Sequence, residues 1–390
     1  MIHYVAQEKG LQSLEKVRIG IIGPSWWVDF WHLAALRNHP DAVIVALCSA
    51  SEREASAVEA KYGSGIQAFT ELERMLDTVA MDGVIVCTPN DLHYPATMAA
   101  LQRGVHVTCE KPIAMHAAQA KEMADTAIRK GLLGMSNFPY RDNPAVRVFR
   151  NCVSDGYLGQ ILHISGQYHG GFGLQHPPGW RGLRARSGSG ILGDLGSHLI
   201  DLVRYISGEE FSSVCASSLT LIPIPGSERE EFRRLRTEAP GVGERNDDSC
   251  AFLAEFASGA QGIFHTSWIA YQGDYVQHQE VEIYGTAGRL HFTANHTGTQ
   301  LRGLKRGEKR WERIPVAGIV PPDEQGQDDE DFFRPGRETP TNTTYRWIEA
   351  IRTGQTTITP DLTEGWRAQQ VIDAVIEASA ERRWVEIEIR

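Results

Sequence analysis

Residues 17 to 28 read Val17-Arg18-Ile19-Gly20-Ile21-Ile22-Gly23-Pro24-Ser25-Trp26-Trp27-Val28. The first six are mostly apolar and β-branched, which predicts a short strand buried on both faces of a sheet. Glycine and proline end this strand, and the helix-period segment Trp31–Asn38 follows. A buried strand, a glycine turn and a helix in this order form the first unit of a doubly wound α/β fold.

The same order recurs through the first third of the chain. Further apolar runs lie at Val43–Cys48, Gly83–Cys87 and Val105–Cys109, and helix-period segments lie at Arg53–Tyr62, Ala96–Arg103 and Ala117–Arg129. Alternating strands and helices predict a parallel sheet covered on both faces. From about Gln160 strands succeed one another, at Ile161–Tyr168, Cys215–Ile222, Cys250–Phe256, Ala260–Trp268 and Val281–Tyr284. This change predicts a second, α+β domain with a mostly antiparallel sheet.

Composition excludes several classes of protein. The 390 residues carry 39 basic and 49 acidic side chains, a net charge of −10, which disfavours nucleic acid and anionic membranes as partners. No run approaches the roughly 18 apolar residues of a membrane span, and Met1–Tyr4 does not open a signal peptide. The six cysteines are scattered, which favours reduced thiols and predicts no metal site. We therefore expect a cytoplasmic protein that acts on a small molecule.

The turn after the first strand lies where dinucleotide-binding folds carry G-x-G-x-x-G. Only the first glycine, Gly23, is present, because Ser25 and Val28 replace the other two. A serine hydroxyl still allows a phosphate to approach, so we predict cofactor contacts at Gly23, Pro24, Ser25, Trp26 and Trp27. The alternative is an ordinary strand-to-helix turn. The two tryptophans either line the cleft or pack the two domains together, and we favour packing.

The end of the second strand bears on the choice of dinucleotide. Folds that select NAD place an acid there to bond the ribose 2′-hydroxyl, but Ser49 occupies that position, with Ser51 and Arg53 close behind. The charge that would exclude NADP is therefore missing, which favours NADP over NAD. Glu52 could replace the acid, and Arg53 could simply be solvated on its helix.

Three later motifs are the most specific in the chain. They are Thr88-Pro89-Asn90-Asp91-Leu92-His93, Cys109-Glu110-Lys111-Pro112 and Gly193-Asp194-Leu195-Gly196-Ser197-His198-Leu199-Ile200-Asp201. Together with the turn, they resemble the Gfo/Idh/MocA family, named for glucose-fructose oxidoreductase and inositol dehydrogenase. The resemblance runs from about Val17 to Ile387.

This resemblance implies a Rossmann domain followed by a domain with an open-faced sheet, and NAD- or NADP-dependent oxidoreduction of a sugar, cyclitol or related polyol. Residues 1–16 would be an extension, 17–137 the dinucleotide domain, and 138–390 the domain for substrate and for pairing into a homodimer or homotetramer. Two further elements are expected in the tail, the helix Asp361–Ala380, packed back on the first domain, and a strand at Trp384–Ile387.

The resemblance also assigns roles to individual residues. Thr88, Pro89, Asn90 and His93 would line the cofactor, Glu110 would contact the nicotinamide ribose, and Lys111 would meet the reacting oxygen. Asp194 and His198 would complete the catalytic group, with His198 as the acid/base. The resemblance suggests that the peptide bond before Pro112 is cis.

The chemistry of these residue types agrees with those roles. Hydride leaves a secondary alcohol only as its hydroxyl proton departs, so a base and a cation are needed, and His198 and Lys111 supply them. A lysine at the end of a buried strand needs a partner, which we expect to be cofactor or substrate. Asp194, His198 and Asp201 would share one face of a helix, where either carboxylate could orient the imidazole. The alternatives are a surface lysine and a helix N-cap beside a solvated histidine.

Beyond the domain boundary, we predict substrate contacts at Tyr140, Trp180 and Arg181, because sugar sites collect aromatic faces and hydrogen-bond donors. Core packing competes for each aromatic residue. Two other functions stay open. One is an NAD-dependent glycoside hydrolase or lyase that oxidises a sugar hydroxyl transiently, and the other is a noncatalytic dinucleotide sensor.

Overall fold

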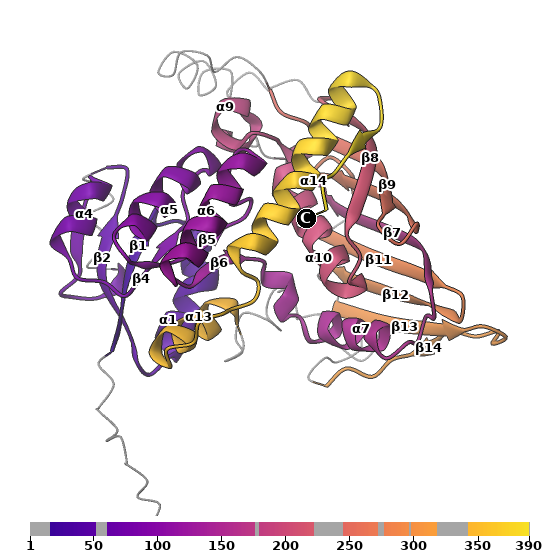
Figure 1. The fold of residues 1–390 in the computed structure, drawn as a ribbon, viewed down its shortest axis with the longest axis horizontal. Helices are drawn as coiled ribbons and strands as arrows, with labels where there is room; N and C mark the ends of the chain where they lie inside the picture. The colour runs from indigo at the N-terminus through magenta and orange to yellow at the C-terminus, as the bar shows by residue number, and fades with distance from the viewer. Residues whose placement is uncertain are drawn as a thin grey trace, which may run out of the picture.

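The first sheet is parallel and has six strands in the order β3-β2-β1-β4-β5-β6 (Figure 1). The computed structural model describes residues 16–51, 61–175, 179–221, 245–271, 277–295, 298–317 and 342–389. The strands of this sheet are β1 Val17–Ile22, β2 Ala42–Cys48, β3 Gln67–Phe69, β4 Gly83–Val86, β5 His106–Glu110 and β6 Gly134–Asn137. The strand order reverses direction between β1 and β4, so ligands are expected at the carboxyl ends of these strands.

Helices cover both faces of the first sheet, as predicted for strands that are apolar on both sides. One face packs against α4 Leu72–Thr78, α5 His93–Gln102 and α6 Ala117–Lys130, and the other against α1 Leu33–Asn38 and α13 Thr343–Arg352. Trp347 of α13 lies so close to β4 that a Cβ on Gly83 would be 2.6 Å from its ring. A helix from the end of the chain thus completes the first domain.

The second sheet has nine strands in the order β14-β13-β12-β11-β7-β10-β9-β8-β15. Its strands are β7 Ile161–Gly170, β8 Phe211–Leu219, β9 Ser249–Phe256, β10 Gln261–Ser267, β11 Gln277–Gly285, β12 Gly288–Asn295, β13 Gly298–Lys305, β14 Glu312–Arg313 and β15 Val385–Glu386. All neighbours pair antiparallel except β7 and β10, which run parallel. The fold class predicted from the sequence is confirmed.

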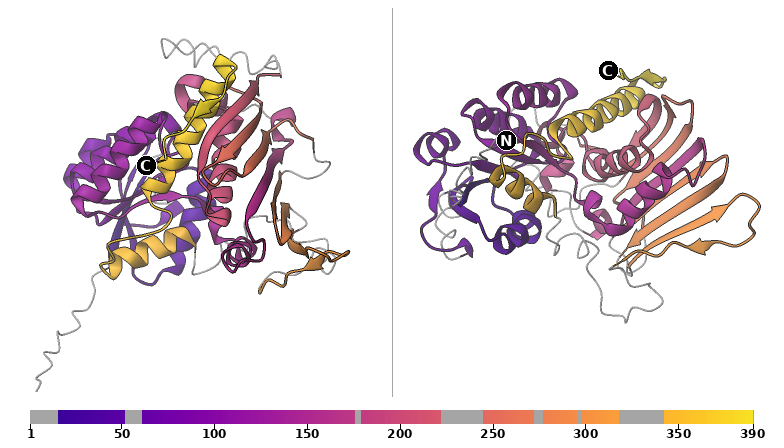
Figure 2. Two further views of the ribbon diagram at one scale, coloured as in Figure 1. Left: turned by 45° about the vertical axis from the view of Figure 1, so that its right-hand side comes forward. Right: turned by 60° about the horizontal axis from the view of Figure 1, so that its bottom comes forward.

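One face of the second sheet packs against helices. These are α7 Pro144–Ser154, α10 Ser197–Ser207 and α14 Leu362–Glu381, which lie on the same side of the sheet in both views of Figure 2. The opposite face carries alternate residues that point outward, among them Ile263, 63% exposed, and its cross-strand neighbour Leu253, 47% exposed. No helix among the described residues is both long and apolar enough to cross a bilayer.

Two short π-helical segments interrupt the regular elements. The first, η1 (Val28–His32), precedes α1, and the second, η5 (Leu192–Gly196), precedes α10. A π-helical turn contains an extra residue, so it changes the direction in which the neighbouring side chains point. Both segments belong to the motifs singled out above.

Candidate active site

Gly23 forms the turn at the end of β1. Its φ is +81°, and a Cβ at this position would lie 2.7 Å from the carbonyl oxygen of Cys87 and 2.8 Å from Cγ2 of Thr88. Only glycine fits this conformation and this close approach of two backbones. Glycine is therefore required at the first position of this turn, and the cofactor contacts predicted for Gly23 and Pro24 stay predictions.

Ser25 uses its hydroxyl inside the turn. The oxygen accepts a hydrogen bond from the backbone N–H of Val28, at 3.3 Å, and lies 3.2 Å from the sulfur of Cys87. These contacts fix the start of the helical segment that follows. A phosphate contact from this hydroxyl stays a prediction, and it would have to coexist with the two internal contacts.

The two tryptophans of the turn behave differently. Trp26 is 64% exposed, so the expectation that it packs the two domains together is wrong. Trp27 stacks on Trp31, with ring centroids 6.0 Å apart, and donates its indole N–H to Oε1 of Glu110 at 2.7 Å. Trp27 therefore points toward the carboxyl end of β5, which is the direction of the predicted cleft.

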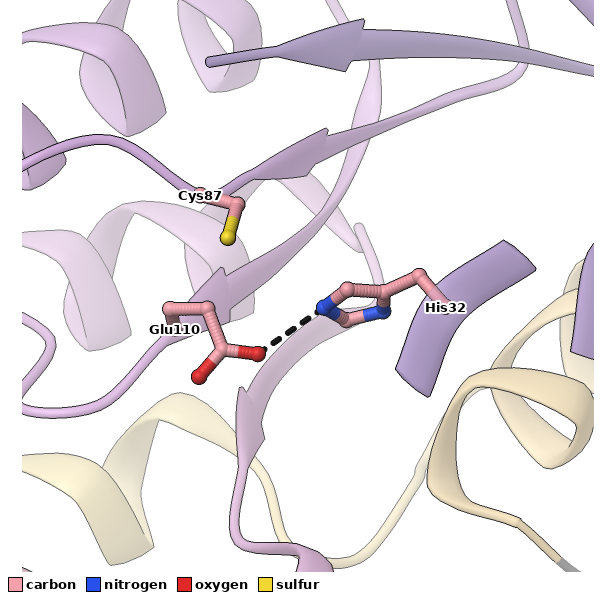
Figure 3. Close-up of side chains that lie close together, drawn as sticks. All are labelled: His32, Cys87 and Glu110. Carbon is pink, nitrogen blue, oxygen red and sulfur yellow. Dashed lines mark hydrogen bonds and ion pairs between the residues drawn. The ribbon is translucent and has the colours of Figure 1, made fainter. Parts of the chain in front are cut away.

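Glu110 lies at the centre of a buried cluster that the sequence did not reveal (Figure 3). Besides Trp27, its Oε1 contacts the ring Nε2 of His32 at 2.8 Å and the side-chain amide of Asn137. Burial favours a higher pKa for Glu110, but the hydrogen bond and charge of His32, the Asn137 amide and Lys111 together hold that pKa below its usual value. The carboxylate is thus ionised, and its position is fixed.

Cys87 is the third labelled side chain of Figure 3. Its sulfur, the His32 nitrogen and a Glu110 oxygen all lie within 4.8 Å of one another, and these atom types occur in zinc sites. Burial, followed by the charge of Glu110, raises the pKa of the Cys87 thiol well above its ordinary value. Because both ring nitrogens of His32 have protein partners and the Glu110 oxygen already accepts several hydrogen bonds, these contacts favour a hydrogen-bond cluster over a metal centre.

The residues after β2 show no carboxylate at the predicted ribose position. Ser49 is buried, and its backbone N–H bonds the carbonyl of Phe69 at 2.9 Å, whereas Ser51 is exposed. Arg53 and Glu52 lie outside the described residues. The ribose contacts of Ser49, Ser51 and Arg53 stay predictions.

His93 does not face a cleft. Its side chain is 1% exposed, and its two ring nitrogens lie 2.8 Å from the carbonyl oxygens of Thr88 and Pro112. We therefore revise its role from a cofactor contact to a link between the loops that follow β4 and β5. Asn90 is also buried and donates to the carbonyl of Ser187 at 3.0 Å. The cofactor contacts predicted for Thr88, Pro89 and Asn90 stay predictions.

Lys111 reaches across to the second domain. Its Nζ donates to the backbone carbonyl of Asp194 at 2.7 Å and to the Asp194 carboxylate at 3.1 Å. The partner of this lysine in the structure is therefore Asp194, where cofactor or substrate was expected. The Lys111–Pro112 bond is cis, as the family resemblance suggested.

Asp194 belongs to η5 and contacts two cations. Its carboxylate lies 3.1 Å from Nζ of Lys111 and 3.3 Å from Nε of Arg181. Burial favours a higher pKa for Asp194, but the charges of Lys111 and Arg181 outweigh it and hold the pKa well below its usual value. Asp194 is consequently an anion that positions both cations, and it is not a helix N-cap.

His198 lies at the start of α10, packed among aromatic rings. The ring centroid of Tyr140 is 4.7 Å from that of the imidazole, nearly perpendicular, and Tyr168 is at 6.2 Å. Its buried Nδ1 has no hydrogen-bond partner among the described residues. Burial, reinforced by the charge of Lys111, holds the pKa of His198 well below its ordinary value, so the ring is neutral and can accept a proton.

Neither carboxylate orients this imidazole, which corrects the expectation of a polar helix face. Asp194 is bound to Lys111 and Arg181, and Asp201 forms a buried pair with Arg141, Oδ2 to Nε at 2.9 Å. For Asp194 the physical reason is η5, because its π-helical turn breaks the α-helical spacing that would place residues four apart on one face. For Asp201, which lies with His198 in α10, the reason is the ion pair with Arg141.

The predicted substrate contacts surround the same centre. Tyr140 packs on His198, and its hydroxyl meets that of Tyr168, which donates to the side chain of Gln277 at 2.7 Å. The Arg181 guanidinium lies 4.5 Å from the ring centroid of Trp180 and contacts Asp194. Gln277 could not be found from the sequence, because nothing local marks it. A neutral base, an ammonium and hydroxyl groups thus converge, which suits proton removal from an alcohol.

Comparisons with known proteins agree with this geometry. Residues 17–138 match the family described as "Oxidoreductase family, NAD-binding Rossmann fold", and residues 146–291 match the GFO/IDH/MocA C-terminal domain. Levoglucosan dehydrogenase from Pseudarthrobacter phenanthrenivorans is 29% identical over 80% of this chain and 82% of its own. Inositol 2-dehydrogenase from Rhizobium meliloti is 26% identical over 95% of this chain and 99% of its own. A solved structure of levoglucosan dehydrogenase in complex with NADH and levoglucosan superposes with a TM-score of 0.79 at 25% sequence identity. The superposition covers 96% of this chain and 100% of the levoglucosan dehydrogenase chain.

Proposed function

The chain belongs to the GFO/IDH/MocA family of NAD-binding oxidoreductases, and on that premise we propose that it moves a hydride between a nicotinamide dinucleotide and a secondary alcohol or ketone of a sugar, cyclitol or related polyol. The relatives named for levoglucosan and inositol support this class of substrate. The observation that carries the proposal is the double contact of Lys111, from the first domain, with Asp194, four residues before the neutral His198, whose pKa the charge of Lys111 lowers.

We assign the following roles. His198 accepts the hydroxyl proton of the substrate during oxidation and returns it during reduction. Lys111 donates to the same oxygen and stabilises its developing negative charge, while Asp194 holds the ammonium in place. The nicotinamide, when bound, accepts or supplies the hydride. Tyr140, Trp180 and Arg181 bind the remaining hydroxyl groups.

The turn at Gly23 fits a dinucleotide. The absence of a side chain there leaves room for close backbone approach, and helical backbone begins at Trp26, where N–H groups favour an anion. We propose that NADP is accepted and preferred, since Ser49 supplies no charge against a 2′-phosphate. Contacts from Thr88, Pro89, Ser51 and Arg53 complete this part of the proposal.

We propose that residues 17–137 bind the dinucleotide and that 138–390 bind the substrate and pair subunits. The supporting observation for pairing is the outward face of the second sheet, where Ile263 and Leu253 are exposed side by side. Burying such a face against a second copy would form a homodimer or, by repetition, a homotetramer. All six cysteines are free, which suits the reducing cytoplasm as the location.

The test is a screen of sugars and inositols with the purified protein and NAD or NADP, followed through the absorbance of the reduced nicotinamide. Sustained reduction of the cofactor with a free sugar or cyclitol is expected. Binding of a dinucleotide without turnover on any polyol would contradict the proposed substrate class, and release of an aglycone without net reduction would contradict the reaction type.

A further inference from the structure

The side chain of Glu110 is held by donors from three separate elements. Trp27 comes from the turn after β1, His32 from the end of η1, and Asn137 from the end of β6, and all three contact the same oxygen, Oε1. Glu110 itself is the last residue of β5 and directly precedes Lys111. Several donors on one carboxylate oxygen fix both the position and the rotation of the group, and they direct its other oxygen elsewhere.

Two of these three donors also form hydrogen bonds with the start of α13. Nδ1 of His32 lies 2.8 Å from the hydroxyl of Thr344, and the side-chain oxygen of Asn137 accepts from the hydroxyl of Thr343 at 2.7 Å. His32 is fully buried. Because both of its ring nitrogens have partners, the imidazole is fixed in position and connects α13 to Glu110.

We propose that His32 is a positioning residue for the nicotinamide half of the dinucleotide: it holds Glu110 so that the free carboxylate oxygen meets the nicotinamide ribose. The proposal rests on the proposed function, in which residues 17–137 bind the dinucleotide, and on the ribose contact that the family resemblance assigns to Glu110. It assigns a role to a buried histidine of η1, the segment that follows the glycine turn, and to the Thr344 hydroxyl behind it.

The test compares two buried histidines that both link α1 or η1 to α13. His32→Gln removes the contact that connects α13 to Glu110, whereas the control His39→Gln removes a contact to Glu349, 3.2 Å away, nearer the C-terminal end of α13. Binding is measured by calorimetry with the reduced dinucleotide that the wild type prefers, and with ADP or 2′-phospho-ADP, which lack the nicotinamide ribose. Thr344→Val, which removes only the hydroxyl behind His32, is the second variant.

We expect His32→Gln to bind the dinucleotide about tenfold more weakly, the value of one hydrogen bond to a charged group, with ADP affinity unchanged. Thr344→Val should show a smaller loss of the same kind, and His39→Gln none. Equal losses for dinucleotide and ADP, or no loss, would overturn the proposal. So would one equivalent of zinc in the wild type that His32→Gln lacks. A wild type that binds ADP but no dinucleotide would instead contradict the proposed function itself.

Discussion

Lys111 and Asp194, 83 residues apart, are joined by two contacts, because Nζ of the lysine meets both the backbone carbonyl and the carboxylate of the same residue. The contact with the Asp194 carbonyl does not depend on the rotamer of the Asp194 side chain. The second domain therefore fixes the Lys111 ammonium even though the Asp194 carboxylate also accepts a hydrogen bond from Arg181. The reacting centre is therefore assembled only when the two domains are docked as in Figure 1.

Replacing the Lys111 ammonium should lower the rate of the chemical step more than the affinity for substrate. We expect Lys111→Met to lower kcat by at least about 1,000-fold, since both charge stabilisation and orientation of the substrate oxygen are lost. Steady-state kinetics measure the loss, with Lys121→Met as the control, because Lys121 is half-exposed and contacts Asp125 and the ring of Trp366, neither of which has a role in the proposed chemistry. A variant that keeps wild-type kcat would remove Lys111 from the mechanism.

The imidazole should set the rate of proton transfer. We expect His198→Asn to lower kcat by roughly 100-fold to 10,000-fold and to leave dinucleotide affinity almost unchanged. Burial and Lys111 hold the pKa of His198 below its ordinary value, so the wild-type oxidation rate should fall only at pH values below the usual histidine range. In Lys111→Met this fall should move to higher pH, because one cause of the low pKa is gone. A pH profile of kcat measures both, and a limb at the same pH in both proteins would count against His198 as the base.

Much of this architecture was predictable because local patterns dominate it. Apolar runs identified β1, β4 and β5 to within a residue or two, since strands buried on both faces admit little else. The strands β12 and β13 were not predicted, because each alternates buried and partly exposed residues, many of them polar, instead of forming a continuous apolar run, and each includes glycine. The site residues that follow strands were found for a similar reason, as motif positions at the ends of β4 and β5.

The geometry that depends on unusual helices was not predictable. An α-helical period places Asp194 beside His198, but η5 directs Asp194 to Lys111, and η1 likewise directs His32 to Glu110. Nothing in local sequence marks a π-helical turn. Contacts that depend on α13, such as that of His32 with Thr344, join residues 312 positions apart and can be seen only in the folded chain.

Gly23 offers a test of the turn that is independent of catalysis. We expect Gly23→Ala to lower the free energy of unfolding by about 1–3 kcal/mol and to abolish tight dinucleotide binding, because the new Cβ meets the Cys87 carbonyl. Gly104→Ala is the matched control, since its φ of +80° imposes the same backbone strain but nothing lies within 4 Å of its Cβ. Urea denaturation measures the free energy of unfolding of both variants. An equal decrease in Gly23→Ala and Gly104→Ala would show that backbone strain alone explains the lower stability.

The outward face of the second sheet should make the stability of the protein depend on pH. His169 lies 2.9 Å from His265, and burial, together with the charges of His265 and His278, lowers the pKa of His169 to about 4, although Glu280 opposes this. In the unfolded chain its pKa returns to about 6.5. Between pH 6.5 and 4 the unfolded chain therefore binds a proton that the native protein does not, so native stability falls as the pH falls through this window.

His169→Gln removes this contribution. We expect the variant to lose less stability than the wild type between pH 6.5 and 4, even if it is somewhat less stable at pH 7 without the contact to His265. His163→Gln, on the same strand with an exposed side chain, should follow the wild-type curve. Urea midpoints at half-unit pH steps give the slopes. If stability falls with pH at the same slope in the wild type and in His169→Gln, then His169 binds its proton equally in the native and unfolded chains, and the prediction is wrong.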